Sequence, residues 1–207
     1  MSTSTAVTID SIVIETDDPA ATDAFHAALG LGDAVRSRRS EAPTTGFRGF
    51  TISLIAAQPS TVDALVRSAL DAGATEVKPV SKSLWGYGGV VQAPDGTLWK
   101  VVSQSKKDTG PATREIDDVV FLIGVADVKA SRRFYEQRGL AVGKSFGGKY
   151  AELDTGSRVK LALYPRKAAA KDAGVPAEGT GSHRIAVRGS ADAFTDPDGF
   201  VWESGSD

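Results

Sequence analysis

Two Pro-Asp-Gly turns in this chain each lead into a segment with a tryptophan at the same place and a charged residue directly after it. The first copy is APDGTLWK, residues 93–100, and the second is DPDGFVWE, residues 196–203. The charged residue is Lys100 in the first copy and Glu203 in the second. A carboxylate can bind a metal ion, whereas a protonated ammonium has no lone pair and repels a divalent cation. The two copies therefore cannot carry out the same chemistry.

The similarity between the two parts of the chain extends beyond these turns. IDSIV at residues 9–13 is echoed by IDDVV at residues 116–120, and FHAALGL at residues 25–31 is echoed by FYEQRGL at residues 134–140. The chain is thus predicted to consist of two related halves, residues 1–104 and 114–207. Residues 105–113 are polar and contain Gly110-Pro111, which is typical of a solvated linker.

Composition excludes several classes of partner. The 207 residues are 41% hydrophobic, with 24 basic and 26 acidic side chains and a net charge of -2, and there is no basic stripe for nucleic acid or anionic lipid. The chain has no cysteine, so it has neither disulfides nor zinc-thiolate sites. Its longest apolar run, residues 119–126, is too short to span a bilayer, and its polar start does not resemble a secretory signal. We expect a cytoplasmic protein that binds neither nucleic acid nor membrane.

Both halves are predicted to open with a strand and a helix. Residues 8–15 are rich in β-branched side chains, and Asp18 can cap a following helix in which Pro19 takes the first position and Gly30 ends the last turn. In the second half Asp127 is the expected cap. The residues expected to face inward from that helix, and the glycine expected to end it, are Ala130, Phe134 and Gly139.

After these helices the halves are predicted to differ. In the first half we expect a strand at 47–56, a helix capped by Ser60 and closed by Gly73, and strands at 75–80, 89–92 and 97–102. In the second half we expect strands at 149–154 and 158–164, a short helix at 166–173 with a basic, exposed surface, and a strand at 183–187. Each half therefore lacks an element that the other has.

These motifs resemble the vicinal oxygen chelate superfamily, which includes glyoxalase I, bleomycin-resistance proteins and extradiol dioxygenases. The resemblance is carried by the strand-helix openings, by residues 73–101 (GATEVKPVSKSLWGYGGVVQAPDGTLWKV), and by GSHRIAV with FTDPDGFVWE in the second half. It implies an α+β fold of tandem βαβββ modules, with two related halves whose curled mixed sheets surround a cavity. The differences between the halves imply that one module is abbreviated in each.

The resemblance leaves the function open, because this fold hosts lyases, dioxygenases, epimerases and drug-sequestering proteins. Metal-dependent members hold a divalent ion with His, Gln or Glu from the first strands of modules and a Glu near the end of a closing strand. At the matching positions the first half offers Ser11, Arg48 or Gly49, and Lys100, none of which is a suitable ligand. The second half offers Asp118, His183 or Arg184, and Glu203.

The middle position of the second half weakens the case for a metal site. Metal-binding relatives often have His directly before an Ile/Val-Ala-Phe/Val triplet, but Arg184 stands there and His183 is one residue away. A one-residue shift in a strand turns a side chain to the opposite face, so His183 is expected to point away from Glu203. A single divalent ion on Asp118, His183 and Glu203 remains the minority alternative. The other histidine, His26, lies in a predicted helix, where packing or exposure explains it.

Other residues suggest a pocket that needs no metal. Aromatic side chains in the glycine-rich segment 84–89, with a few polar groups, would suit a small molecule. The candidate ligand contacts are Arg48, Trp85, Tyr87, Lys100, Arg184 and Glu203. Lys100 and Glu203 are also expected to form an ion pair if the halves pack about a pseudo-twofold axis. Trp99 and Trp202 are expected to be structural, and the basic run at residues 36–39 is expected to be a solvated edge strand.

The sequence thus predicts a glyoxalase/bleomycin-resistance-like protein that binds a small molecule in its cavity without a metal cofactor. The alternative is a lyase or dioxygenase of the same superfamily that uses one divalent metal ion in the second half, so enzymatic activity stays open at this point. A third alternative is a scaffold whose cavity has closed. Association into a homodimer is compatible with either of the first two functions.

Overall fold

Each half opens with a strand followed by a helix, and the helix begins at an aspartate cap. The computed structural model describes residues 7–84 and 86–205. Strand β1 (Ile9–Thr16) and helix α1 (Pro19–Leu29) open the first half, and β8 (Asp118–Val125) and α3 (Val128–Glu136) open the second. The side chain of Asp18 accepts a hydrogen bond from the N–H of Ala21, and Asp127 caps α3 in the same way. Both predicted caps are confirmed.

The rest of the first half contains a second helix and several strands. They are the short 3₁₀ turn Gly32–Ala34, then β2 (Val35–Arg39), β3 (Thr44–Gly46), β4 (Phe50–Ile55), α2 (Pro59–Asp71), β5 (Thr75–Ser83), β6 (Gly86–Gln92) and β7 (Leu98–Ser103). The prediction that Ser60 caps α2 is wrong, because Pro59 already takes the first helical position. Ser60 lies inside the helix, and its N–H donates to Oδ1 of Asp108 in the linker at 2.8 Å.

In the described part of the second half, up to residue 205, one further helix follows. The elements of this part are β9 (Ala141–Ser145), β10 (Ala151–Asp154), β11 (Val159–Pro165), α4 (Arg166–Ala173), β12 (Gly179–Gly181), β13 (Ile185–Gly189), β14 (Phe194–Thr195) and β15 (Val201–Ser204). Strand β13 begins two residues later than predicted. Arg184 has a φ of 50°, in the left-handed region, which interrupts the extended backbone before Ile185.

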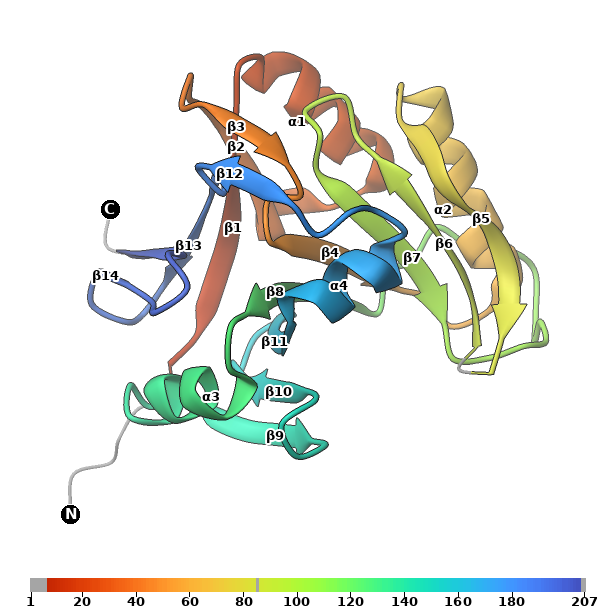
Figure 1. Ribbon diagram of the computed structural model, residues 1–207. Helices are drawn as coiled ribbons and strands as arrows, with labels where there is room; N and C mark the ends of the chain where they lie inside the picture. Colours follow the sequence, from red (N-terminus) through yellow and green to blue (C-terminus); the bar gives the residue numbers. More distant parts are fainter. Residues whose placement is uncertain (1–6, 85, 206–207) are drawn as a thin grey trace.

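One sheet has eight strands, in the order β5-β6-β7-β4-β8-β11-β10-β9 (Figure 1). It contains two complete βαβββ modules, residues 50–103 and 118–165. In each module the first strand pairs in parallel with the last, β4 with β7 and β8 with β11. The two modules join where β4 pairs antiparallel with β8.

The other large sheet has five strands, in the order β14-β15-β13-β1-β2. It contains the two abbreviated modules: β1 and α1 with β2 from the first half, and β13 to β15, without a helix, from the second. They join where β1 pairs antiparallel with β13. The expected abbreviation of one module in each half is therefore confirmed. Each half supplies one module to each sheet, and the short ribbon of β3 and β12 ties the halves together once more.

The main hydrophobic core contains residues of both sheets and of the first three helices. Trp99 and Trp202 are fully buried in it, as expected for structural tryptophans. On α3 the buried residues are Val128, Ser131 and Tyr135, while Phe134 is half-buried and Ala130 is exposed. The prediction that Ala130 faces inward is therefore wrong, whereas Phe134 packs against the core but is only partly buried.

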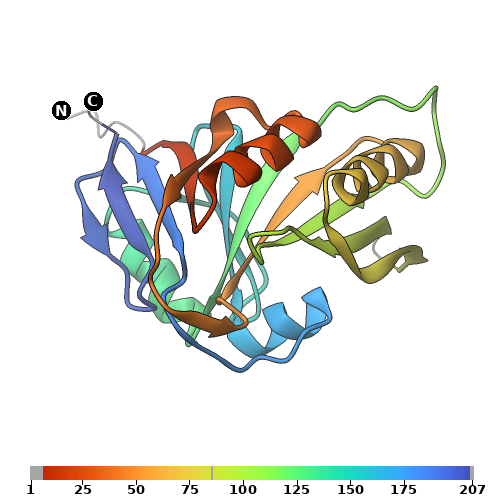
Figure 2. The ribbon, with the colours of Figure 1, turned by 90° about the horizontal axis from the view of Figure 1, so that it is seen from above.

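Helix α4 lies on the side of the eight-stranded sheet opposite α1 and α2 (Figure 2). Its three alanines at 169, 170 and 173 are buried against Leu98 and Leu122 in a second, smaller apolar cluster. Gly124 lets the helix approach, since a Cβ there would lie 3.0 Å from the Cα of Arg166. The 166–173 helix was expected to be a basic surface turn, but one of its faces is part of the core. We call the side of the sheet that it covers the α4 face.

None of the helices in the described part of the chain has the length and hydrophobicity that crossing a bilayer requires.

Candidate functional site

The two charged residues that follow the repeated tryptophans lie in different sheets. Lys100 is on β7 of the eight-stranded sheet, and its ammonium forms an ion pair with the carboxylate of Asp172 on α4. Glu203 is on β15 of the five-stranded sheet and forms an ion pair with Arg38, with 2.7 Å between Nη1 and Oε1. The predicted contact between Lys100 and Glu203 is therefore wrong, because each has a partner of its own.

Arg38 connects two carboxylates of the five-stranded sheet. Besides Glu203, it binds Glu15 of β1, with 2.5 Å between Nη2 and Oε1 and 3.0 Å between Nε and Oε1. Burial works against the charge of Arg38, but the hydrogen bonds to the two glutamates outweigh it and raise the pKa of the guanidinium. The edge strand predicted at residues 36–39 is confirmed, but Arg38 is not a merely solvated side chain. Its guanidinium lies between a carboxylate of β1, the opening strand, and a carboxylate of β15, the closing strand.

The three residues of the minority metal site are not brought together. Asp118 lies on β8 in the eight-stranded sheet and forms an ion pair with Lys160 of β11, with 2.7 Å between Oδ2 and Nζ. The bond from Lys160 to Asp118 raises the pKa of the lysine. Glu203 is in the other sheet and is bound to Arg38. Among the described residues there is no group of three or more histidine or acidic side chains that could hold a metal ion.

His183 has a structural position between two segments of the backbone. Its Nδ1 lies 2.5 Å from the carbonyl oxygen of Arg48, and its Nε2 lies 3.0 Å from the carbonyl oxygen of Asp198. The ring stacks on Phe200, with 4.0 Å between the ring centroids. Since both nitrogens face backbone carbonyls, neither is directed toward Glu203. The residues present at this place therefore do not fit a divalent ion.

The larger cavity, of about 360 Å³, lies on the α4 face at the end of the sheet formed by β5, β6 and β7. Its floor includes Ile55, Val90 and Val102, and its charged groups are Lys78, Lys100 and Asp172. Lys78 donates from Nζ to the backbone carbonyl of Asp172 at 2.9 Å, in addition to the ion pair of Lys100 with the Asp172 carboxylate. The lining also includes the polar residues Ser81, Ser83, Ser103 and Gln104. The cavity combines an apolar floor with two ammonium groups and one carboxylate.

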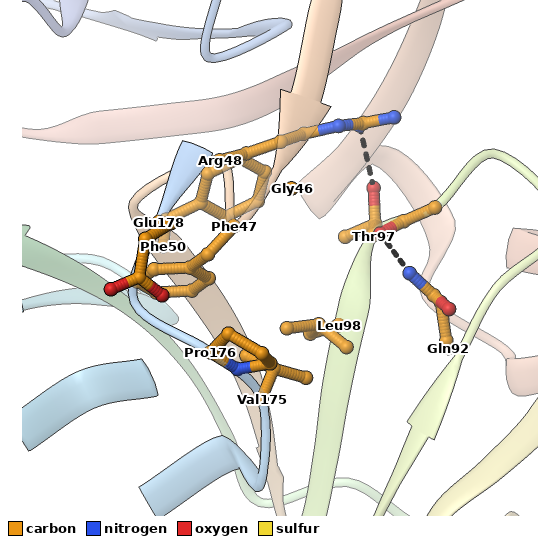
Figure 3. Close-up of a pocket in the computed structure, with 11 residues that line it drawn as sticks. Gly46, Phe47, Arg48, Phe50, Gln92, Thr97, Leu98, Val175, Pro176 and Glu178 are labelled. Carbon is orange, nitrogen blue, oxygen red and sulfur yellow. Dashed lines mark hydrogen bonds between the residues drawn. The ribbon is translucent and has the colours of Figure 1, made fainter. Parts of the chain in front are cut away.

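A smaller cavity, of about 290 Å³, lies beside the turn between β6 and β7 (Figure 3). Phe47, Phe50 and Leu98 form apolar walls, and Arg48 and Thr97 lie at one end. The guanidinium of Arg48 donates to the backbone carbonyl of Asp95 and lies 3.8 Å from the Asp95 carboxylate. Burial lowers the pKa of Arg48, against the attraction of Asp95. Because its donors already have protein partners, Arg48 mainly holds this turn in place.

Of the remaining candidate contacts that the structure describes, Arg184 lines neither cavity. Arg184 donates from Nε to the carbonyl of Ala42 and from Nη1 to the carboxylate of Asp17, both at 2.7 Å, so it ties the start of β13 to neighbouring loops. Trp85 lies outside the described residues. Tyr87 lines the larger cavity. Its hydroxyl, however, donates at 2.7 Å to Asp63 of α2, which lies on the side of the sheet opposite α4. Of the six candidates, Tyr87 and Lys100 therefore line the larger cavity and Arg48 lines the smaller one.

Two partners at these places were missed from the sequence. Asp172 was not recognised because the 166–173 helix was interpreted by its basic residues. The alanines at 169, 170 and 173 recur on one helix face, and that spacing was the available signal of burial. The partnership of Arg38 with Glu15 and Glu203 had no such signal, since it depends on β1, β2, β13 and β15 meeting in one sheet.

Comparison with known proteins gives structural relatives only. The sequence matches no protein-family model and no curated protein sequence. The structure is similar to glyoxalase I from Zea mays, with a TM-score of 0.62 and 13% identity, covering 95% of this chain and 91% of that one. It is also similar to a Bacillus subtilis protein named provisionally as a dioxygenase, with a TM-score of 0.54 and 12% identity, covering 93% of this chain and 72% of that one.

These identities are too low to carry an activity across, and the TM-scores over most of both chains show a shared fold. The chain therefore has the fold of these proteins, the glyoxalase fold.

Proposed function

We propose that this protein binds a small molecule in the larger cavity on the α4 face and that it does so without a metal cofactor. The fold alone does not decide this, because it supports both catalysis and binding. The observation that carries the proposal is the cavity itself. Its volume of about 360 Å³ is in the range of small-molecule pockets, and it combines an apolar floor with a few charged groups.

The ion pairs of the two sheets support the metal-free part of the proposal. Glu203 and Asp118 are the acidic candidates for a metal site, and each is bound to a cation of the chain itself, Arg38 or Lys160. A divalent ion at Glu203 would have to displace a guanidinium that also binds Glu15. Both acidic candidates are thus already paired with cations of the protein.

A ligand screen with cavity-filling variants tests the binding proposal. The protein is screened against small molecules by thermal shift, and each hit is measured by calorimetry in Val102→Trp and Val201→Trp. Val102 lines the cavity, whereas Val201 is on the five-stranded sheet and is 40% exposed. Binding that is lost in Val102→Trp and retained in Val201→Trp supports the proposal. Hits that bind both variants equally, or a screen without any hit, contradict it.

Metal analysis tests the alternative of a divalent-metal-dependent lyase or dioxygenase. Protein purified without chelator is analysed for bound transition metals, together with the Glu203→Ala variant. We expect no stoichiometric metal in either protein. One metal ion per chain in the wild type that is lost in Glu203→Ala would refute the metal-free proposal and favour the enzyme.

A further inference from the structure

The positive charge in the larger cavity is only partly balanced. Lys78 and Lys100 both direct their ammonium groups to one residue, Asp172, in the last turn of α4. Asp172 offers Lys100 its carboxylate but offers Lys78 only a backbone carbonyl. Within the lining of the cavity there are thus two ammonium groups and one carboxylate. A ligand that adds a negative charge would balance this excess.

The carboxylate of Asp172 stands in the cavity as an anionic ligand would. It comes from α4, which covers the α4 face through its alanines and leaves the β5 to β7 end of the sheet open. The side chain of Lys100 is 17% exposed, whereas that of Asp172 is 45% exposed. The lysine is therefore held in the cavity wall, while the carboxylate remains accessible to solvent and to competitors.

The apolar floor limits what else the ligand can be. Ile55, Val90 and Val102 lie next to Lys100 on the same side of the sheet, so an apolar body can rest there while its anionic group meets the ammonium. An inorganic anion would leave this floor exposed. The chemistry fits a small organic anion with one carboxylate or phosphate group and an aromatic or aliphatic body.

From these contacts we infer that the ligand of the larger cavity is a small organic anion, and that Asp172 is an internal competitor that occupies Lys100 in the free protein. This inference rests on the proposed binding function and adds to it the class of ligand and a built-in competition. Binding replaces the ion pair between Lys100 and Asp172 with one between Lys100 and the ligand. The carboxylate of Asp172 then turns to solvent, where its exposure already places part of it.

The row of residues that contains Lys100 offers a matched control. Lys100 lies opposite Ser53, Ser53 opposite Val120, and Val120 opposite Lys160 across β7, β4, β8 and β11. Lys160 is thus a second lysine in the same row, with its own ion pair, but it does not line the cavity. Neutralising Lys160 changes the net charge as neutralising Lys100 does, without changing the proposed site.

Calorimetric titration with benzoate, its neutral analogue benzamide, and phenyl phosphate tests the inference. In Asp172→Asn the affinity for benzoate should rise by about two- to fivefold, because half-exposed ion pairs are weak. In Lys100→Gln the affinity for benzoate should fall by about tenfold or more, since a buried or partly buried charge pair is lost. Benzamide should bind these variants equally, and Lys160→Gln should bind benzoate as the wild type does. Phenyl phosphate distinguishes a phosphate from a carboxylate as the preferred group.

Three results would overturn the inference. Benzamide binding as tightly as benzoate would remove the anionic class, and an unchanged benzoate affinity in Asp172→Asn would remove the competition. Absence of binding by benzoate and phenyl phosphate to both the wild type and Asp172→Asn would also overturn it. The binding function itself is judged by the broader screen, where a neutral compound excluded by Val102→Trp would leave the proposed function standing while this inference fails.

Discussion

Replacing His26 with phenylalanine should stabilise the protein, and more so in mild acid. His26 is 5% exposed, packs against Trp99 with 5.7 Å between the ring centroids, and has an Nδ1 without a hydrogen-bond partner. The related position on α3 is occupied by Tyr135, whose hydroxyl donates to Asp196 at 2.6 Å. At this position the first half thus has a buried polar group without a partner, whereas the polar group of the second half is hydrogen-bonded.

The size of the expected stability gain follows from the burial of His26 and from the direction of its pKa shift. A buried polar atom without a partner costs about 1–3 kcal/mol, and part of the gain is lost in fitting the larger phenyl ring, so we expect about 1 kcal/mol at pH 7.5. Burial lowers the pKa of His26, against the attraction of Asp95 and Asp23. The folded protein therefore binds fewer protons at His26 than the unfolded chain does, and wild-type stability falls as the pH drops below the unfolded value of about 6.5.

Urea denaturation of the wild type and His26→Phe at pH 7.5 and pH 5.5 measures both effects. The variant lacks the titrating group, so its advantage should grow at pH 5.5, by up to about 1.4 kcal/mol for each pH unit below the unfolded pKa. The two proteins differ only at residue 26, so the comparison isolates His26. The reasoning is refuted if the difference in unfolding free energy is the same at both pH values, or if the wild type is the more stable protein at pH 5.5.

Two further substitutions test the packing of the second half. Tyr135→Phe removes the hydroxyl that donates to the buried carboxylate of Asp196 and accepts from an indole N–H, so we expect a loss of about 1–3 kcal/mol in urea denaturation; no loss would mean that this network contributes nothing. Gly124→Ala adds a Cβ 3.0 Å from the Cα of Arg166 and should cost about 1–3 kcal/mol by displacing α4. Gly110→Ala, which meets no atom within 4 Å, is its control, and equal melting temperatures for the two glycine variants would contradict this account.

The features that the sequence predicts correctly are those that depend on neighbouring residues. Asp18 and Asp127 cap their helices because a short acidic side chain can reach the N–H groups two or three residues ahead. Gly30 ends α1 with a φ of 71°, a conformation that glycine adopts without steric cost. The repeated motifs predict two related halves, and the resemblance, with the element that each half lacks, implies an abbreviated module in each.

Sequence patterns led to wrong predictions where two neighbouring residues compete for one structural role. Ser60 has the side chain of a good cap, but Pro59 begins the helix before it. Phe134 and Tyr135 are adjacent aromatic residues on α3, and the helix turns the tyrosine inward, where its hydroxyl donates a hydrogen bond to Asp196. That choice depends on a residue 61 positions away, so the helix pattern alone could not make it.

By itself, the sequence determined the caps and turns and the two related halves. It also determined that Lys100 and Glu203 are equivalent positions of the repeat. Only the tertiary structure decided where those positions lie: β7 pairs with β4 in one sheet and β15 with β13 in the other, so Lys100 meets Asp172 and Glu203 meets Arg38. Caps and turns are set by atoms a few residues apart. The choice of ion-pair partner is set by strand pairing and helix packing between distant segments, whose energies depend on the whole chain.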